Sequence, residues 1–158
     1  MNTPDDYRFH SLLHASHLLD ERLRENLLPL DIRPRQARVL DALERMGSAS
    51  QVELTREFGI TAGSMSTMVS RLEKRGLIQR SRHPDERRSD VLSLSDAGRS
   101  QLEAIHRNWE AMDECIDTAI GQEKAQLLAE LTAELRQALG GRIPGQTPNT
   151  EAATIRKR

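Results

Sequence analysis

Residues 50–76, SQVELTREFGITAGSMSTMVSRLEKRG, decide the fold, because they predict two short helices joined by a tight turn. The first four, SQVE (residues 50–53), form a capping box, in which a serine hydroxyl and a glutamate carboxylate satisfy the backbone amides at a helix start. Gly59 predicts the end of that helix. Thr61 can cap a second helix that ends near Gly76. Two short helices with this connection form a helix-turn-helix.

The second helix has two chemically different faces. The predicted buried face is apolar and consists of Met65, Met68, Val69 and Leu72. The outer face carries hydroxyl and cationic side chains: Thr61, Ser64, Ser66, Thr67, Ser70, Arg71 and Lys74. Small side chains let a helix approach the floor of the DNA major groove, and cations meet the phosphates. We therefore predict DNA contact here, the alternative being an ordinary solvated helix face.

The sequence changes period after the second helix. The segments LIQRSR (residues 77–82) and SDVLSLS (residues 89–95) favour β-strands and flank the polar tip HPDERR (residues 83–88). This pattern predicts a β-hairpin, or wing. Its cationic side chains are Arg80, Arg82, Arg87 and Arg88. Guanidinium groups are favoured in the narrow, negative minor groove, so we predict DNA contact, with Arg87 or Arg88 entering that groove.

Two acidic residues share the tip with these arginines. Asp85 and Glu86 would repel phosphate if they were unpaired. We expect them to anchor the wing by holding a neighbouring arginine in place with a charge-assisted hydrogen bond. The alternative is that residues 83–88 are only a soluble loop tip.

Amphipathic helices surround this unit on both sides. A first helix is expected from about Pro4 to Leu28, and Pro34 fits the first turn of a second helix that Gly47 can end. Beyond the hairpin, Asp96 is the expected N-cap of a long helix. The apolar positions of that helix are Leu102, Ile105, Trp109, Met112, Ile116 and Ile120. Gly121 interrupts it, and a last leucine-rich helix extends to Leu139.

The expected fold class is mainly α with a small β-hairpin wing. We divide the chain into an N-terminal dimerisation helix (1–30), a winged helix-turn-helix (31–98), C-terminal dimerisation helices (99–140) and a disordered tail (141–158). The outer helices carry apolar stripes that a winged domain of about 70 residues cannot cover. A second copy is the economical partner, because two-fold symmetry in a protein matches two half-sites in DNA.

The charges are unevenly distributed along the chain, although the net charge is only −1. Seven basic and three acidic residues lie between Arg71 and Arg88, whereas eight acidic and three basic residues lie between Gln101 and Leu139. This basic centre suits a nucleic-acid partner. No apolar run reaches the roughly 18–20 residues that a membrane span needs, and no signal-peptide pattern is found, so we expect a cytoplasmic protein.

The chain resembles the multiple-antibiotic-resistance-regulator (MarR) family from its beginning to about Leu139. The segment LTREFGITAGSMSTMVSRLEKRGLIQR (residues 54–80) is similar to the helix-turn-helix of the family. PDERRSDVLSLSDAG (residues 84–98) is similar to its acidic-x-Arg wing and the Leu-Thr-x-x-Gly helix start that follows. The resemblance implies a two-fold dimer that binds a pseudo-palindrome, usually as a repressor that a small molecule or an oxidant releases.

This chain departs from the family pattern at two places. Counting back from Leu94, the usual wing aspartate falls on Glu86 and its arginine on Arg88, unless Asp85 takes the acidic role. Which arginine enters the minor groove therefore stays open. Ser95 replaces the commoner threonine and still provides a capping hydroxyl.

The resemblance also places an effector pocket between the dimerisation helices and the winged domain. The candidate lining residues are His17, Arg38, His106 and Trp109. An aromatic ring, an imidazole and a guanidinium would suit a small aromatic carboxylate. Trp109 also fits the apolar stripe of its helix, and we expect it to be a core residue instead.

Metal, redox and enzymatic functions are not expected. His10, His14 and His17 repeat at helical spacing and could gather with His106, but no carboxylate matches that spacing. We predict no metal and no cofactor. Cys115 is the only cysteine, so no internal disulfide forms, and its acidic sequence neighbours disfavour a reactive thiolate.

We consider three classes of function for this chain: an enzyme, a protein-binding adaptor and a DNA-binding regulator. The sequence has no nucleophile elbow, phosphate loop or zinc motif, which argues against an enzyme. A winged protein that contacts only other proteins is the second rival, and strong salt dependence of DNA binding would exclude it. We predict a sequence-specific DNA-binding transcription regulator, most simply a repressor, with activation and the effector identity left open.

Overall fold

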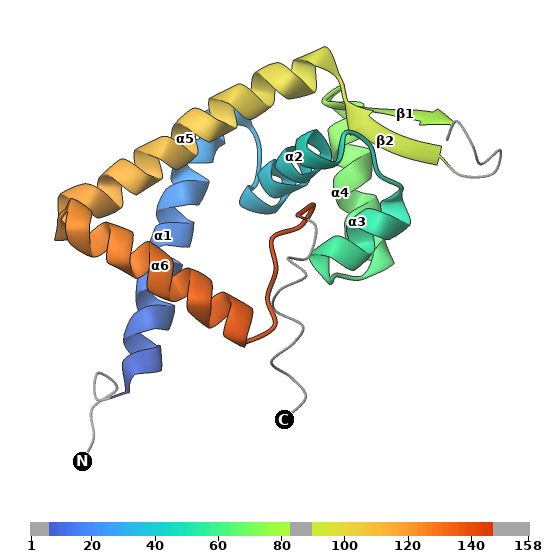
Figure 1. The fold of residues 1–158 in the computed structure, drawn as a ribbon. Helices are drawn as coiled ribbons and strands as arrows, with labels where there is room; N and C mark the ends of the chain where they lie inside the picture. Colours follow the sequence, from blue (N-terminus) through green and yellow to red (C-terminus); the bar gives the residue numbers. More distant parts are fainter. Residues whose placement is uncertain (1–6, 83–89, 147–158) are drawn as a thin grey trace, which may run out of the picture.

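The computed structural model describes residues 7–82 and 90–146, and Figure 1 shows its arrangement. Within these residues the chain is mainly helical with one two-stranded antiparallel sheet, as the sequence predicts. The wing residues Asp85, Glu86, Arg87 and Arg88 lie outside the described residues. Of the described helices, none combines the length and apolar character that a membrane crossing requires.

The N-terminal part consists of two helices and a short turn. Helix α1 covers Arg8–Leu27, and a 3-10 turn, η2, follows at Leu28–Leu30. The helix begins later than the predicted Pro4, because Tyr7 is extended. Helix α2 covers Pro34–Met46 with its proline in the first turn, where the missing amide costs nothing.

The helix-turn-helix is formed by α3 (Gln51–Phe58) and α4 (Ala62–Lys74). The predicted capping box is present: the Glu53 amide donates to the Ser50 hydroxyl at 3.2 Å, and the Ser50 amide donates to the Glu53 carboxylate at 2.7 Å. Gly59 has φ +60° and ends α3, and Thr61 caps α4 by accepting from the Ser64 amide at 3.2 Å. Met65, Val69 and Leu72 are buried and Met68 is partly buried, as the sequence predicts.

The wing is a hairpin of β1 (Ile78–Arg82) and β2 (Asp90–Leu94). Its register pairs Ile78 with Leu94 and Arg82 with Asp90. An isolated bridge joins Ala49 to Leu92, with amide-to-carbonyl distances of 3.0 and 2.8 Å. Because Ala49 immediately precedes Ser50, the N-cap of α3, this bridge fixes the base of the wing to the helix-turn-helix.

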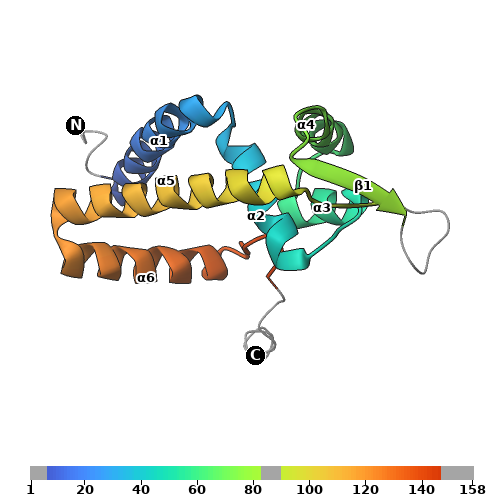
Figure 2. The ribbon, with the colours of Figure 1, turned by 90° about the horizontal axis from the view of Figure 1, so that it is seen from above.

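Two long helices complete the described chain: α5 (Asp96–Ile120) and α6 (Gln122–Ala138). The predicted cap at Asp96 is wrong. Ser95 is the N-cap, and its hydroxyl accepts from the Gly98 amide at 3.0 Å, so that Asp96 is already the first helical residue. Gly121 separates α5 from α6, and Figure 2 shows α6 lying beside α5 in the opposite direction.

The hydrophobic core lies in the winged domain. Its largest fully buried side chains come from the end of α1, from α2 to α4, from β2 and from the first half of α5. Trp109 is partly buried against this core, as expected from its place in the stripe. In contrast, α6 has no buried residue. The leucines of α6 at positions 127, 128, 131 and 135 are exposed, and so is Leu139 directly after the helix.

The C-terminal segment differs from the expectation of a tail that is disordered from Gly141. Residues 141–146 turn back from α6 and run to a position between α2 and α3 (Figure 1). Arg142 forms an ion pair with Glu57 of α3 at 3.0 Å, and Pro144 is buried. For residues 141–146 the prediction is wrong, because glycines and a proline were read as unstructured chain, whereas here they make turns. Residues 147–158 of the predicted tail lie outside the described residues.

Candidate nucleic-acid interface

Helix α4 presents its hydroxyl face to solvent. All seven residues predicted for DNA contact are exposed: Thr61, Ser64, Ser66, Thr67, Ser70, Arg71 and Lys74. The Thr67 hydroxyl donates to the Gly63 carbonyl at 3.0 Å, and the Thr61 hydroxyl donates to that of Ser64 at 2.9 Å. The Ser64 hydroxyl therefore accepts from Thr61 and can still donate to an external acceptor. The opposite face of α4 is buried in the core, so the helix is held in place while its hydroxyl face stays exposed.

Three cations near the end of α4 have different surroundings. Arg71 and Lys74 are exposed and form no ion pair within the described part of the chain. In contrast, the guanidinium of Arg75 donates to the carbonyls of Leu30, at 3.0 Å, and Asp31. Arg75 thus ties the end of α4 to the turn between α1 and α2, and only Arg71 and Lys74 are available for an external anion.

Arg80 of the wing is engaged by the helix beside it. Its Nε lies 2.9 Å from Oε1 of Glu73, and its Nη2 lies 3.3 Å from Oε2, so the pair is bidentate. The hydrogen bond that Arg80 donates to Glu73 raises the pKa of Arg80, burial opposes the rise, and the charges of Glu73 and Asp90 add to it. Glu73 and Arg80 therefore connect α4 to β1. Arg82 is exposed at the end of β1 and has no ion-pair partner among the described residues.

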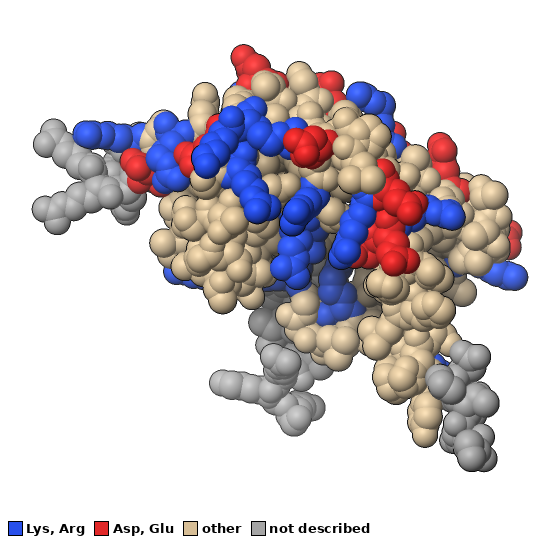
Figure 3. Space-filling view, turned by 180° about the vertical axis from the view of Figure 1, so that it is seen from behind, with Lys and Arg blue, Asp and Glu red and all other residues tan. Residues whose placement is uncertain are grey.

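Cationic side chains also surround a hollow beside α4. In the view from behind, Lys and Arg side chains gather across the middle of the molecule (Figure 3). A hollow of about 730 Å³ lies between the end of α1, the start of α2 and α4. Four arginines line it: Arg24, Arg33, Arg35 and Arg71. The sequence analysis missed Arg33 and Arg35, although their position on either side of Pro34 marks them as exposed at a helix start.

The predicted effector residues do not gather in one place. His17 is exposed and pairs at 3.3 Å with Glu21, a carboxylate one helical turn further along α1 that the sequence analysis overlooked. Arg38 lies over the ring of Phe58, 5.8 Å from its centroid. His106 and Trp109 are neighbours, with ring centroids 5.3 Å apart. None of the four predicted residues lines the arginine-rich hollow. Trp109 and His106 instead belong to the contact between α5 and the winged domain.

The structure also bears on the metal and thiol questions. Within residues 7–82 and 90–146, no group of three His, Cys, Asp or Glu side chains could hold a metal ion, and this range includes His10, His14 and His17. Cys115 is half-buried, and its Sγ accepts from the Arg22 guanidinium at 2.6 Å. The sequence analysis considered only the acidic neighbours on the same helix and missed this cation from α1.

Comparisons with known proteins agree with this geometry. The family model described as "MarR family" matches residues 30–89. The multiple antibiotic resistance protein MarR of Salmonella typhimurium is 31% identical over 97 residues, which are 61% of this chain and 67% of that protein. The Escherichia coli protein of the same name is 30% identical over 88 residues, 56% of this chain. The match to it spans 61% of its length, less than two thirds.

A solved structure extends the likeness to most of the fold. The transcriptional repressor CouR, bound to a 23-mer DNA duplex, superposes with a TM-score of 0.76 at 26% sequence identity. The alignment covers 83% of this chain and 93% of that one. It therefore reaches beyond the residues that the family model matches and includes the outer helices.

Proposed function

Because the chain belongs to the MarR family of winged helix-turn-helix transcription regulators, we propose that it is a homodimeric repressor released from its operator by a small organic anion. Members of this family are regulators of transcription and not enzymes. The operator is a pseudo-palindrome, with one half-site for each winged domain. The protein acts in the cytoplasm, where a bacterial operator is found.

The outer face of α4 carries this proposal. Arg71 and Lys74 are exposed, have no ion-pair partner among the described residues and lie next to small hydroxyl side chains. Hydroxyl groups of this size let the helix backbone enter a major groove, and two free cations match the phosphates on its edge. Arg82, exposed at the end of β1, extends the basic surface along the wing. Arg87 and Arg88, outside the described residues, are the candidates for the neighbouring minor groove. In this arrangement Arg80 positions the wing through Glu73.

Helices α1 and α6 provide the surface that we propose binds the second copy of the chain. Leucines 127, 131 and 139 of the α6 region are 54%, 53% and 78% exposed, and Phe9 and Leu13 of α1 are 56% and 61% exposed. Apolar side chains gathered on the exposed faces of neighbouring helices mark an interface. A two-fold dimer covers both copies of this surface at once. We therefore keep the division into arms (1–30 and 99–140) and a winged domain (31–98).

The arginine-rich hollow is the proposed effector site. Leu28, Ile32 and Met68 give it an apolar side for a ring, and its guanidinium groups suit a carboxylate. Ser64, Thr67 and Arg71 of the recognition helix also line it. A bound aromatic carboxylate would compete with DNA phosphate for Arg71, so binding of the two ligands is negatively coupled.

Selection from a pool of random duplexes tests the proposal without knowledge of the operator. The purified protein is expected to enrich an inverted repeat whose half-sites lie about one helical turn, roughly 10 base pairs, apart. The matched control is Arg71→Ala with Lys74→Ala, which removes both free cations of α4 and should enrich no sequence. Enrichment of a single unrepeated half-site would contradict the dimer, and no enrichment by the wild type would contradict the DNA-binding face.

A further inference from the structure

The chain leaves α6 through a defined turn. Gly140 has φ +78°, its amide donates to the Gln137 carbonyl at 2.9 Å, and the Gly141 amide donates to the Arg136 carbonyl at 2.8 Å. These two bonds and the left-handed glycine are a Schellman motif, which ends a helix and sets the direction of the next residues. The segment that follows, residues 141–146, is called the C-terminal strap below.

A second turn seats the strap on α2. The Gln146 amide donates to the Ile143 carbonyl at 3.2 Å, with Pro144 second in the turn and Gly145, at φ +78°, third. Proline followed by a glycine of positive φ is the pattern of a type II turn. A Cβ on Gly145 would lie 3.2 Å from the Ala42 carbonyl oxygen. The turn therefore fits against the backbone of α2, with Pro144 buried.

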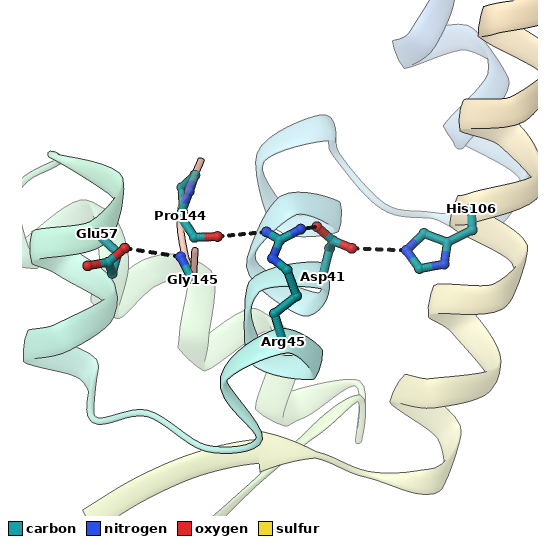
Figure 4. A network of polar contacts seen from close by, with 6 residues as sticks. All are labelled: Asp41, Arg45, Glu57, His106, Pro144 and Gly145. Atoms are coloured by element: carbon teal, nitrogen blue, oxygen red, sulfur yellow. Dashed lines mark hydrogen bonds and ion pairs between the residues drawn. The ribbon is translucent and has the colours of Figure 1, made fainter. Parts of the chain in front are cut away.

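Polar contacts hold the strap to the helix-turn-helix. Glu57, near the end of α3, accepts from the Gly145 amide at 3.0 Å and pairs with the Arg142 guanidinium at 3.0 Å. Arg45 of α2 donates to the Pro144 carbonyl at 2.7 Å. The Glu57 side chain is only 19% exposed, so its contacts with the strap are partly shielded from water. Figure 4 shows the Pro144 carbonyl and the Gly145 amide between Arg45 and Glu57.

The same contacts continue to α5. Arg45 also binds Asp41, whose other oxygen lies 3.0 Å from Nε2 of His106 (Figure 4). The Asp41 side chain is 14% exposed. A closed path therefore runs from α5 along α6, through the strap to α3 and α2, and through Asp41 back to α5.

We infer that the C-terminal strap fixes the helix-turn-helix relative to the α5–α6 arm, with Glu57 and Arg142 as positioning residues for operator recognition. The inference rests on the proposed function, because the arms of a dimer carry both recognition helices. The separation of these helices must match the distance between two half-sites. A strap that joins α3 to the end of α6 restricts how far apart the two recognition helices of the dimer can lie.

Two truncations separate the strap from the residues beyond it. One ends at Gln146 and keeps the strap; the other ends at Gly141 and removes residues 142–146, which make all of its contacts with α2 and α3 described above. Both lack the basic residues at positions 156–158, so any nonspecific phosphate contact from them cancels in the comparison. Each protein is measured by fluorescence anisotropy on the selected operator and on the same operator with one base pair inserted between the half-sites. The insertion turns one half-site by about 34° and moves it by about 3.4 Å.

The ratio of the two dissociation constants is the readout, because a general loss of affinity or stability leaves a ratio unchanged. We expect the wild type and the chain ending at Gln146 to bind the inserted operator about tenfold more weakly or worse. The chain ending at Gly141 should lose most of this discrimination, to less than about threefold, while remaining a dimer by light scattering. Equal discrimination by the two truncated chains would overturn the inference.

Point variants keep the test decisive if the shorter chain does not fold. Glu57→Ala removes the two contacts that Glu57 makes with the strap, whereas Glu57→Gln keeps an oxygen for the Gly145 amide and loses the charge. Discrimination should fall in the order wild type, Glu57→Gln, Glu57→Ala; identical ratios in all three would overturn the positioning role. Failure of the wild type to bind any selected duplex would instead refute the proposed function, so the two failures are distinguishable.

Discussion

Replacing Gly98 by alanine should destabilise the fold severely, because the glycine lies against the backbone at the base of the wing. A Cβ at this position would lie 1.9 Å from the Leu77 carbonyl oxygen and 3.0 Å from its carbon. That oxygen cannot easily retreat, because it accepts from the Ser95 amide at 3.1 Å. Gly98 is held as well, since its own amide donates to the Ser95 hydroxyl at 3.0 Å.

The magnitude follows from the size of the required shift. Ordinary contact needs a separation of about 3.4 Å, so two hydrogen-bonded backbone segments must move apart by more than about 1 Å in a closely packed region. Inserting a methyl group into a packed core costs about 1–3 kcal/mol when side chains can adjust. Here the obstacle is backbone, and we expect a loss of about 3 kcal/mol or more.

Gly63→Ala is the matched control. Gly63 lies in the first turn of α4, as Gly98 lies in that of α5, but a Cβ there meets nothing within 4 Å. Its stability should be unchanged or slightly raised, by up to about 0.5–1 kcal/mol, since alanine favours helix. Urea unfolding followed by circular dichroism measures both, at one protein concentration because dimerisation contributes to stability. A midpoint for Gly98→Ala equal to that of the wild type would refute the reasoning.

Further predictions concern the wing, the cap and the dimer. Glu73→Ala and Arg80→Ala should each weaken operator binding several-fold, and the double variant should be no weaker than either, because the two residues act as a pair; additive losses would show that Arg80 contacts DNA independently. Ser50→Ala should cost about 1 kcal/mol of stability in urea unfolding, from the lost capping box. Leu131→Asp should give a monomer by light scattering, and a dimer would exclude α6 from the interface. Arg88→Ala should weaken operator binding by about tenfold or more, from a lost groove contact, with dimerisation unchanged; wild-type affinity would leave Arg87 as the minor-groove residue.

The sequence predicted best those features that are decided within a few residues. The capping box at Ser50, the end of α3 at Gly59 and the proline start of α2 depend only on neighbours, and all are confirmed. For α5, helical spacing wrongly gave Asp96 as the N-cap, whereas the capping hydroxyl that the family resemblance assigned to Ser95 is confirmed. The Ser95 hydroxyl lies 2.5 Å from the Gly76 carbonyl oxygen as well as near the Gly98 amide, and this contact with the end of the preceding helix region cannot be read from local spacing.

Features that join distant parts of the chain were predicted less well. The exposure of the α4 outer face followed from its period, yet the diversion of Arg80 to Glu73 and of Arg75 to Leu30 did not. The arginine-rich hollow needs the α1–α2 turn to return beside α4, which no local pattern encodes. The Pro-Gly pair of the strap could have predicted a turn. The contacts of that turn with α2 and α3 join residues far apart in the sequence and could not be predicted from it.

The salt dependence of DNA binding tests the central claim most directly. Binding of the selected operator is measured from low to moderate salt for the wild type and for the single variants Arg71→Ala and Lys74→Ala. The control is Arg107→Ala, which removes an exposed cation of α5. The account predicts a linear fall of log K with log salt, with a slope about one unit shallower for each lost α4 cation and unchanged for Arg107→Ala. Equal slopes for all four proteins, or no salt-dependent binding by the wild type, would contradict recognition of DNA through the outer face of α4.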